Sequence, residues 1–363
     1  MIKGKLDNHT LERLVLGRTG ASRPEVIVGP GIGQDCAVMD FGDYECVLST
    51  DPITASASRI GFLAVHVSCN DVASKGVEPI AVMLTVLLPP TVTEDEISDI
   101  ARQADEAAKS LGVQIVGGHT EVTDSVTQPL VSATAIGRRS VSCGGQPAVP
   151  LRFDGMKPDS KSSHQNNYQV SYANLQGTAG CPLHDSGDMI VVTKTLALEG
   201  TAIVAEHKGQ ELQPYLTDEE IGRAKAMIDQ ISVVKEGVIA GRLGIETMHD
   251  ITEGGVLGAV WETCARLGVG AEIDAFALPF DPVTMTICAL LDLDPMRLIS
   301  SGSMLMFVKN DIWDSLSAEL TDAGIMAVVI GKVQPSGHGI ALIMKNGERE
   351  TIGPPGPDEI YKI

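Results

Sequence analysis

The chain has 363 residues, enough for about two domains, and its 44% hydrophobic content lets each domain bury a core. The 47 acidic residues outnumber the 27 basic ones and give a net charge of −20. This balance argues against a nucleic-acid or anionic-membrane binder, because both classes need a basic surface.

The seven cysteines are scattered, and none forms a Cys-x-x-Cys pair. Their odd number in a chain of this length argues against a disulfide framework and favours a reducing compartment. Residues 1–7 contain no apolar signal core, and no apolar run approaches the roughly 20 residues of a membrane span. We therefore expect a cytoplasmic protein without a membrane anchor.

In chain order, the first predicted elements are a short helix and a strand. The helix is expected over Leu11–Leu16, where Asn8 or Thr10 can cap it, and the strand over Glu45–Ser49, which Pro52 ends. Five further elements precede residue 140: a helix of small and apolar residues at Arg59–Ser74, a buried strand at Ile80–Leu88, a helix at Thr93–Leu111, and strands at Gln114–Val116 and Val126–Ile136.

Composition changes near Ser140. From Cys143 to Gly180, Ser, Asn, Gln, Gly and Pro dominate and apolar periodicity is weak. We interpret residues 143–184 as an insertion or mobile loop, the alternative being an ordered excursion of the first domain.

The second half again predicts mixed helices and strands. Its elements are strands at Asp188–Thr193, Met304–Lys309 and Ala327–Val333, helices at Glu199–His207, Glu219–Ile231, Lys235–Leu243 and Gly255–Leu267, and a short turn or strand end at Met248–Asp250. The proline-rich run Gly353–Pro357 indicates a stiff tail. These patterns divide the chain into domains over 1–142 and 185–345, the segment 143–184 between them, and a tail over 346–363.

Acidic and glycine-rich clusters stand at the ends of several predicted elements in the first half. Gly31 and Gly33 permit close approach of the backbone to a phosphate, and Asp35 beside them can hold Mg²⁺, although Gly-Pro-Gly is also a common plain turn. Asp51 follows a strand. Asp71 lies on an apolar helix, where it needs a cation or a hydrogen bond unless it is a helix-terminal cap.

A second glycine-rich cluster follows the predicted strand at 114–116. It consists of Gly117, Gly118, His119, Thr120 and Glu121, and its two glycines indicate a tight turn or close approach to a ligand. Carboxylates on separate elements, each near a glycine-rich turn, suit a Mg²⁺ shell that leaves positions for phosphate and water. Together these clusters predict a Mg-nucleotide site.

The second half offers candidate catalytic residues at His249, Asp250 and Thr252. Asp250 or Thr252 can cap the helix that follows, and the N–H groups of Gly254 and Gly255 at its start form a natural anion site. A capped helix without a ligand is the alternative.

The order of these motifs resembles the aminoimidazole ribonucleotide (AIR) synthase, or PurM-like, superfamily, and within it the HypE-like AIR-synthase-related proteins. The resemblance covers residues 10–140 and 185–345 and rests on the motifs at Gly29–Asp35, Ser49–Thr54, Cys69–Pro79, Gly117–Glu121 and His249–Gly255. It implies a two-domain α+β fold. An N-terminal α+β domain pairs with its mate in a homodimer, and a C-terminal α/β domain turns a glycine-rich segment toward the nucleotide.

The resemblance also implies ATP and Mg²⁺ as cofactors, with the phosphates in the cleft between the domains. On matching positions, Asp35, Asp51 and Asp71 become the Mg²⁺ acids, with Asn70 and the turn at 117–118 beside them. His119 stands where some members carry an acid, so Glu121 is the residue that can supply the missing carboxylate.

The activity that the resemblance implies is Mg-ATP-dependent activation of a carbonyl, amide or phosphate oxygen, on a small-molecule or protein-borne acceptor. The alternative is a non-catalytic nucleotide-binding accessory factor in the maturation of a hydrogenase-type metalloenzyme. No cysteine follows Cys288, so the reaction of HypE on a C-terminal cysteine is not expected. Residues 1–30 hold no cysteine either, which argues against selenophosphate synthesis.

Overall fold

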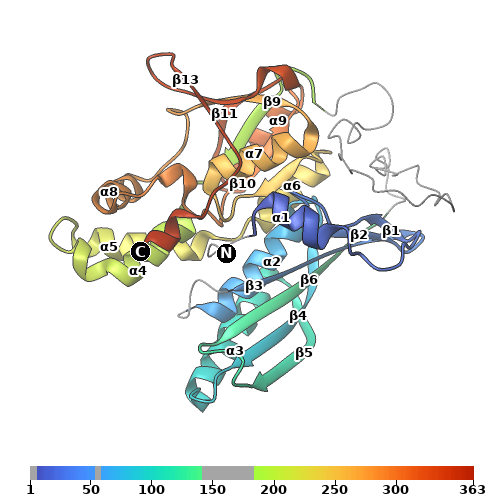
Figure 1. The fold of residues 1–363 in the computed structure, drawn as a ribbon, viewed down its shortest axis with the longest axis vertical. Coiled ribbons are helices and arrows are strands. Elements are labelled where there is room, and N and C mark those ends of the chain that lie inside the picture. Colours follow the sequence, from blue (N-terminus) through green and yellow to red (C-terminus); the bar gives the residue numbers. More distant parts are fainter. Residues whose placement is uncertain (1–5, 54–58, 141–183) are drawn as a thin grey trace.

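The computed structural model describes residues 6–53, 59–140 and 184–363 (Figure 1). Within these ranges the strands form a six-stranded sheet in the N-terminal half and a seven-stranded sheet in the C-terminal half. Apart from His184, the predicted insertion at 143–184 lies outside the described residues. No helix in these ranges is long and apolar enough to cross a membrane.

The N-terminal sheet has the strand order β1-β2-β3-β6-β4-β5, and only β4 and β5 pair in parallel. Its strands are β1 Val26–Val28, β2 Ala37–Asp40, β3 Tyr44–Ile53, β4 Pro79–Leu88, β5 Gln114–Val122 and β6 Leu130–Ser140. The two predicted helices, α2 (Ile60–Ala73) and α3 (Glu94–Leu111), pack on one face of it. Thr93 and Glu96 form a reciprocal capping box that starts α3.

Several details of this half differ from the predictions, which also lack β1 and β2. The first helix begins at Asn8 as α1 (Asn8–Leu11), capped by Asp7, and continues as a π-helix, η1 (Glu12–Leu16). Strand β3 runs through Pro52. On the edge of β3 that faces β2, pairing stops at Leu48, so residues of β3 after Leu48 need no N–H donor toward β2. Strand β5 continues to Val122, so residues 117–121 belong to a strand and not to a turn. Strand β6 begins only at Leu130.

Strand β4 also differs from the buried strand that its apolar run predicts. From Val82 on, more buried and more exposed residues largely alternate; before it the register is irregular, and Ile80 and Met83 are 47% and 46% exposed. One face of β4 therefore lies against the helices, and the other is open to solvent in the single chain.

The C-terminal sheet has the order β13-β12-β9-β11-β7-β10-β8 and is antiparallel except for the pair β9 and β12. Its strands are β7 Met189–Thr193, β8 Met248–Asp250, β9 Gly270–Asp274, β10 Met304–Val308, β11 Ala327–Gln334, β12 Ile340–Ile343 and β13 Arg349–Thr351. Its helices are α4 Leu198–Leu212, α5 Asp218–Ala226, α6 Val234–Arg242, α7 Gly255–Leu267, α8 Pro282–Leu291 and α9 Trp313–Asp322, with 3-10 turns η3 Met227–Gln230, η4 Pro295–Arg297, η5 Ser336–His338 and η6 Glu359–Lys362.

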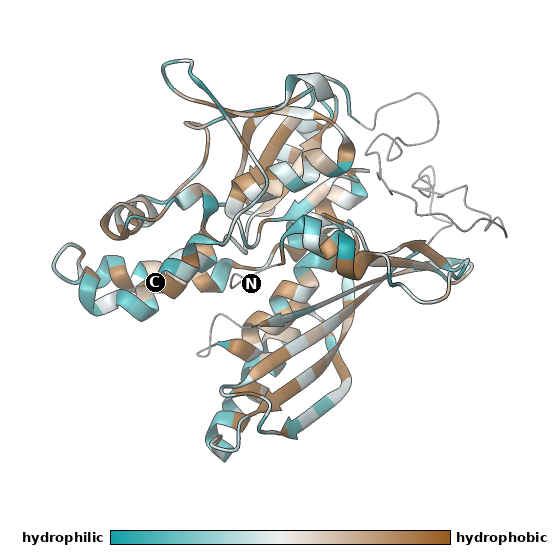
Figure 2. Cartoon of the chain, viewed as in Figure 1, coloured by the Kyte–Doolittle hydropathy of each residue, from teal (hydrophilic) through white to brown (hydrophobic). Residues whose placement is uncertain are grey.

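Helices cover both faces of this sheet at its centre, which explains why strands β7 and β10 are almost uniformly apolar (Figure 2). Strand β10 shows the arrangement clearly. Leu305 and Phe307 pack with α7 on one face, whereas Met304 and Met306 pack with α6 and α9 on the other. The central strands are therefore buried on both sides.

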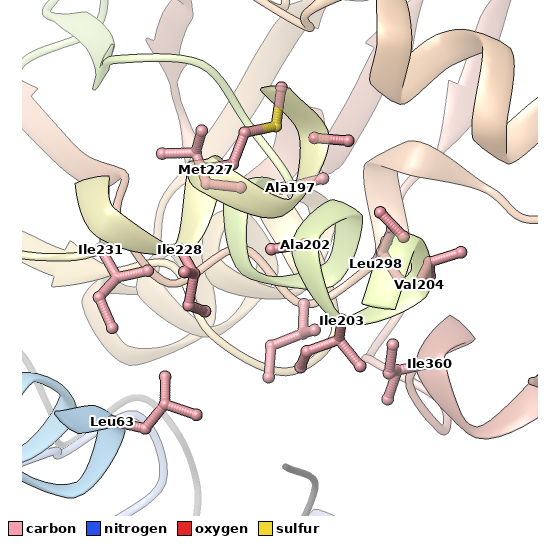
Figure 3. Packing of buried hydrophobic residues seen from close by; sticks show 14 of the residues in the cluster. Leu63, Ala197, Ala202, Ile203, Val204, Met227, Ile228, Ile231, Leu298 and Ile360 are labelled. Carbon is pink, nitrogen blue, oxygen red and sulfur yellow. The ribbon is translucent and has the colours of Figure 1, made fainter. Parts of the chain in front are cut away.

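A third apolar cluster joins the two halves of the molecule (Figure 3). Leu63 of α2 contributes to it from the N-terminal half, and α4 supplies Ile203 and Val204. Ile360, near the end of the chain, belongs to the same cluster, so the segment 346–363 packs onto the C-terminal half instead of extending as a tail. This segment is buried because the side chain of Ile360 is apolar and because Asp358 forms the contacts described below.

Helices α2 and α6 meet almost backbone to backbone. A Cβ placed on Gly237 would lie 2.4 Å from the carbonyl oxygen of Ala73, and one on Gly241 would lie 2.4 Å from that of Gly76. Only glycine fits at such an approach. The contact fixes α2, which carries Asp71, against the C-terminal half.

Candidate functional site

Three of the singled-out residues meet where the two halves join. Asp35 lies just before β2 in the N-terminal half, and His249 and Asp250 lie in β8 of the C-terminal half. Each offers a side-chain ligand atom within 4.8 Å of the other two. The Nδ1 atom of His249 is 3.6 Å from Oδ2 of Asp35 and 3.9 Å from Oδ1 of Asp250.

Asp71 and Ser49 extend this cluster inward. The Oγ atom of Ser49 lies 2.9 Å from the carbonyl oxygen of Asp35 and also hydrogen-bonds Oδ2 of Asp71. Burial raises the pKa of Asp71 well above its usual value, and the charges of Asp250, Asp51 and Asp35 raise it further. Four carboxylates therefore share this site.

His249 is held in its charged form. Its Nε2 atom lies 3.2 Å from Oε2 of Glu262 on α7. Burial alone would lower the pKa of His249, but the charge of Asp35, the adjacent carboxylate of Asp250, and the hydrogen bond and charge of Glu262 outweigh burial and raise it to about 10. At neutral pH the imidazole therefore carries two protons and serves as a hydrogen-bond donor.

Two further cations lie at the edge of the cluster. The Nζ atom of Lys75 is 3.8 Å from Oδ2 of Asp35. The guanidinium of Arg266 on α7 also lies near Asp35; burial lowers its pKa and the charge of Asp35 opposes that shift. Gly33, with φ +68°, packs against α7 at Arg266, so the turn that carries Gly31 and Gly33 adjoins the cluster.

The residues present fit a bound Mg²⁺. In the part of the chain that the structure describes, neither carboxylate oxygen of Asp250 has a hydrogen-bond partner, although the residue is 1% exposed. A buried carboxylate without a hydrogen bond is costly unless cations compensate it; the imidazole of His249, 3.9 Å from Oδ1 of Asp250, is one such group, and a metal ion would be another. Hard oxygen donors are the ligands that Mg²⁺ prefers. Asp35, Asp71 and Asp250 are the residues that would hold the ion, with Asp51 beside them.

The structure does not bring Glu121 to this cluster within one chain. Asp51, Ala133, Leu84 and Gly118 stand in one cross-strand row. Strand β5 is three strands from β3, which is about 14 Å at ordinary strand spacing. Glu121, Thr120 and His119 lie exposed on β5, where Nε2 of His119 is 3.1 Å from Oε2 of Glu121.

Gly118 has a structural reason to be glycine, because a Cβ there would lie 1.9 Å from the carbonyl oxygen of Leu84 in the neighbouring strand. Gly117 precedes it in β5, at the position paired with Met83. The glycine pair is therefore part of the pairing between β4 and β5 and does not form a tight turn.

Asn70 likewise has partners within the protein. Its Nδ2 donates to the carbonyl oxygen of Ile231 at 2.8 Å, and its Oδ1 accepts from the N–H of Val233 at 2.8 Å. Both ends of the amide are thus bound to the C-terminal half. Asn70 ties α2 to the segment before α6 instead of facing a nucleotide.

The predicted anion site at the start of α7 holds a carboxylate of the chain itself. Gly254 and Gly255 adopt φ +87° and +61°, and the N–H of Gly254 donates to Oδ2 of Asp358 at 2.7 Å. Asp250 does not cap this helix, since its carboxylate has no hydrogen-bond partner among the described residues. The N–H of Gly255 donates to the carbonyl oxygen of Thr252.

Sequence reasoning missed Ser49, Lys75, Glu262 and Arg266. Ser49 and Lys75 lie in the motifs at Ser49–Thr54 and Cys69–Pro79, where the prediction rested on the acids Asp51 and Asp71. Glu262 and Arg266 are spaced by four residues on α7, which places them on one helix face. That spacing was the available signal, but charged pairs at this spacing are common on solvated helices.

Comparison with known proteins places these features in a family. The family model for the AIR synthase related protein N-terminal domain matches residues 33–139, and that for its C-terminal domain matches residues 185–343. A putative hydrogenase expression/formation protein of Methanocaldococcus jannaschii is 25% identical over 344 residues, covering 91% of this chain and 90% of that protein. The carbamoyl dehydratase HypE of Escherichia coli is 24% identical over 317 residues, covering 86% and 81%.

The fold is also similar to solved structures. That of a hydrogenase maturation protein HypE in complex with ATP has a TM-score of 0.67 at 18% identity and covers 99% of this chain and 97% of that chain. At this identity the likeness concerns the fold alone. It confirms the predicted two-domain α+β architecture.

Proposed function

Because the chain belongs to the AIR synthase related protein family, we propose that it is a Mg-ATP-dependent enzyme that activates a carbonyl, amide or phosphate oxygen of an acceptor by phosphoryl transfer. The observation that carries this proposal is the largely buried cluster of Asp35, His249 and Asp250 at the junction of the two halves, with the buried Asp71 beside it. The names of a relative, carbamoyl dehydratase, and of a similar structure bound to ATP support the choice of nucleotide.

The chain's own residues can prepare such a site in three ways. The carboxylates hold the ion, and Mg²⁺ when bound neutralises charge on the phosphates. Lys75 and Arg266 place positive charge beside Asp35, which suits a polyphosphate that must approach an acidic protein. His249, fixed by Glu262, can donate a hydrogen bond, because the neighbouring carboxylates raise its pKa.

A second candidate function is an accessory factor in hydrogenase-type maturation that binds nucleotide without turnover. It is favoured by the name of the Methanocaldococcus relative and by a similar structure, of a HypE–HypF complex, with a TM-score of 0.66 at 18% identity. In that case the chain would bind a protein partner and would have no substrate that accepts a phosphoryl group. ADP release distinguishes the two functions.

We also infer a homodimer that forms through the open face of β4. Ile80 and Met83 expose apolar side chains there, and β5 beside them is an edge strand with unpaired backbone groups. A second copy of the sheet would cover both. The resemblance to a family that pairs through this domain supports the same arrangement.

The proposal is tested by calorimetry of ATP binding with Mg²⁺ and with EDTA. We expect binding only with Mg²⁺, and a loss of at least tenfold in affinity for Asp71→Asn and Asp250→Asn, taking a charge-assisted contact as about 1.5–3 kcal/mol. Asp105→Asn removes the same charge from the exposed face of α3 and should bind as the wild type does. Wild-type affinity in both cluster variants would contradict the assignment.

ADP release by the wild type with a panel of amide, carboxylate and phosphate acceptors then tests turnover. An acceptor-dependent release identifies the enzyme and its substrate class. Tight Mg-ATP binding with no release under any acceptor favours the accessory factor.

A further inference from the structure

Helix α7 receives its N-terminal cap from the far end of the chain. The first N–H groups of any helix lack partners within it, and the residue before α7, Gly254, has no side chain to supply one. The N–H of Gly254 donates instead to Asp358, 104 positions away in sequence. Asp358 is 3% exposed.

The same carboxylate joins two more segments. Its Oδ1 accepts from the N–H of Ile299 at 3.2 Å and from that of Ile360 at 2.8 Å. Burial raises the pKa of Asp358 to about 6, while the three backbone N–H groups that it accepts from favour its ionised form. Asp358 therefore ties together the start of α7, the loop before β10, and η6.

Neighbours of Asp358 strengthen this attachment. The N–H of Asp294 donates to Oε2 of Glu359 at 3.0 Å. The hydroxyl of Tyr361 donates to Oε1 of Glu253 at 3.0 Å. Residues 358–361 thus contact both the turn that enters α7, at Glu253, and the loop before η4, at Asp294.

That turn leads directly out of the candidate site. Four residues, 251–254, separate Asp250 of β8 from the first residue of α7. Farther along the same helix, Glu262 binds His249, and Arg266 packs on Gly33. A displacement of the start of α7 would therefore move groups on two sides of the cluster.

We propose that Asp358 is a positioning residue of this site, which caps α7 from the end of the chain and thereby holds the turn after Asp250. The inference rests on the proposed function, because it takes the carboxylate cluster to be the working metal site. A carboxylate in this place also implies that its removal leaves a pocket of unsatisfied N–H groups that a small anion can fill.

The test compares two aspartate caps. Asp358→Ala removes the cap of α7, and Asp281→Ala removes the local cap of α8, where Oδ1 of Asp281 accepts from the N–H of Val283 at 2.8 Å. The probes are Mn²⁺ alone, titrated by calorimetry, and hydrogen exchange of the peptide that spans residues 251–258. We expect Asp358→Ala to weaken Mn²⁺ binding at least fivefold and to speed exchange at least tenfold, and Asp281→Ala to change neither.

Sodium formate, compared with sodium chloride at equal ionic strength, should restore part of both properties in Asp358→Ala and have no effect on the wild type. If Asp358 stabilised α7 without positioning the site, formate would slow hydrogen exchange in Asp358→Ala but would not change its affinity for Mn²⁺. If Asp358→Ala does not fold, Asp358→Asn keeps the volume and one acceptor, and the same changes are expected at smaller size.

The outcomes separate the two proposals. A wild type that binds no Mn²⁺ contradicts the proposed function and the positioning role with it. A wild type that binds Mn²⁺, together with an Asp358→Ala variant of equal affinity, contradicts the positioning role alone. Unchanged exchange at residues 251–258 in Asp358→Ala would show that Asp358 does not hold the turn.

Discussion

Glu199 is a buried acid in the first turn of α4, with 4% of its surface exposed. It forms hydrogen bonds with Ser301, but its Oε2 atom has no partner within the described ranges. Burial raises its pKa to about 7, with smaller contributions from the charges of Asp358 and Glu253. Its usual pKa, about 4.5, applies in the unfolded chain.

This difference makes the free energy of unfolding depend on pH. Since the folded state binds the proton more tightly, the contribution of Glu199 is fully present below pH 4.5 and is lost as the pH rises to 7. The loss amounts to about 3 kcal/mol. We expect Glu199→Gln, which cannot ionise, to become more stable relative to the wild type by up to that amount between pH 4.5 and pH 8, as measured by urea denaturation.

Glu206→Gln on the exposed side of the same helix is the matched control and should follow the wild type at every pH. Equal pH dependence in Glu199→Gln and the wild type would show that Glu199 does not take up a proton on folding.

Single acids of the site could be predicted where their context is unusual. Asp71 stands on an otherwise apolar helix, which predicts a carboxylate that needs a cation or a hydrogen bond, and Asp35 follows a run of glycines, which predicts a carboxylate that can hold Mg²⁺. Asp250 was a catalytic candidate, but the structure places it among the carboxylates. Glu121 could not be excluded from the cluster by sequence, because the length of β5 depends on pairing with β4 and not on local pattern.

At the scale of elements, α2 depends on one side chain for its attachment to the segment before α6. Asn70 satisfies two backbone groups there, on Ile231 and Val233, and both residues are fully buried. An unsatisfied buried polar group costs about 1–3 kcal/mol. We therefore expect Asn70→Ala to lower the free energy of unfolding by about 2–5 kcal/mol in guanidinium titrations.

Asn346→Ala, in an exposed turn, should change stability by less than about 0.5 kcal/mol. If Asn70→Ala keeps its stability and loses only ATP affinity, Asn70 is a nucleotide ligand and not a tie between elements.

Helices were the elements that sequence periodicity predicted best. Thr93–Leu111 carries apolar residues at helical spacing and begins with a capping box, and α3 follows it within one residue. Strand limits were less accessible. Pro52 does not end β3, because the neighbouring strand β2 pairs with β3 only as far as Ala37, opposite Leu48. The local sequence around Pro52 cannot predict where a neighbouring strand stops. The packing of residues 358–361 could not be predicted either, since their partners lie more than 50 positions away in sequence.

At the scale of the whole molecule, the open face of β4 predicts the state of assembly. We expect the wild type to sediment as a dimer at micromolar concentration and Met83→Lys to sediment as a monomer, because a charge there would be buried without a partner. The variant should keep its thermal stability as a monomer, since Met83 is 46% exposed in the single chain.

Met326→Lys is the control for that experiment, because Met326 is also 46% exposed but lies in the C-terminal half. A dimer that persists in Met83→Lys would place the contact between copies elsewhere.

The backbone contact between α2 and α6 bears on how a ligand could enter. Many two-domain enzymes close around their substrate by rotating about a hinge, which needs an interface that can part. Here Gly237 and Gly241 lie directly on the end of α2, and Asn70 fastens the same helix, so a rotation would open several tight contacts at once. The two halves should thus behave as one rigid body. The radius of gyration from small-angle scattering should be the same with and without Mg-ATP, and any opening that admits the nucleotide must come from loops.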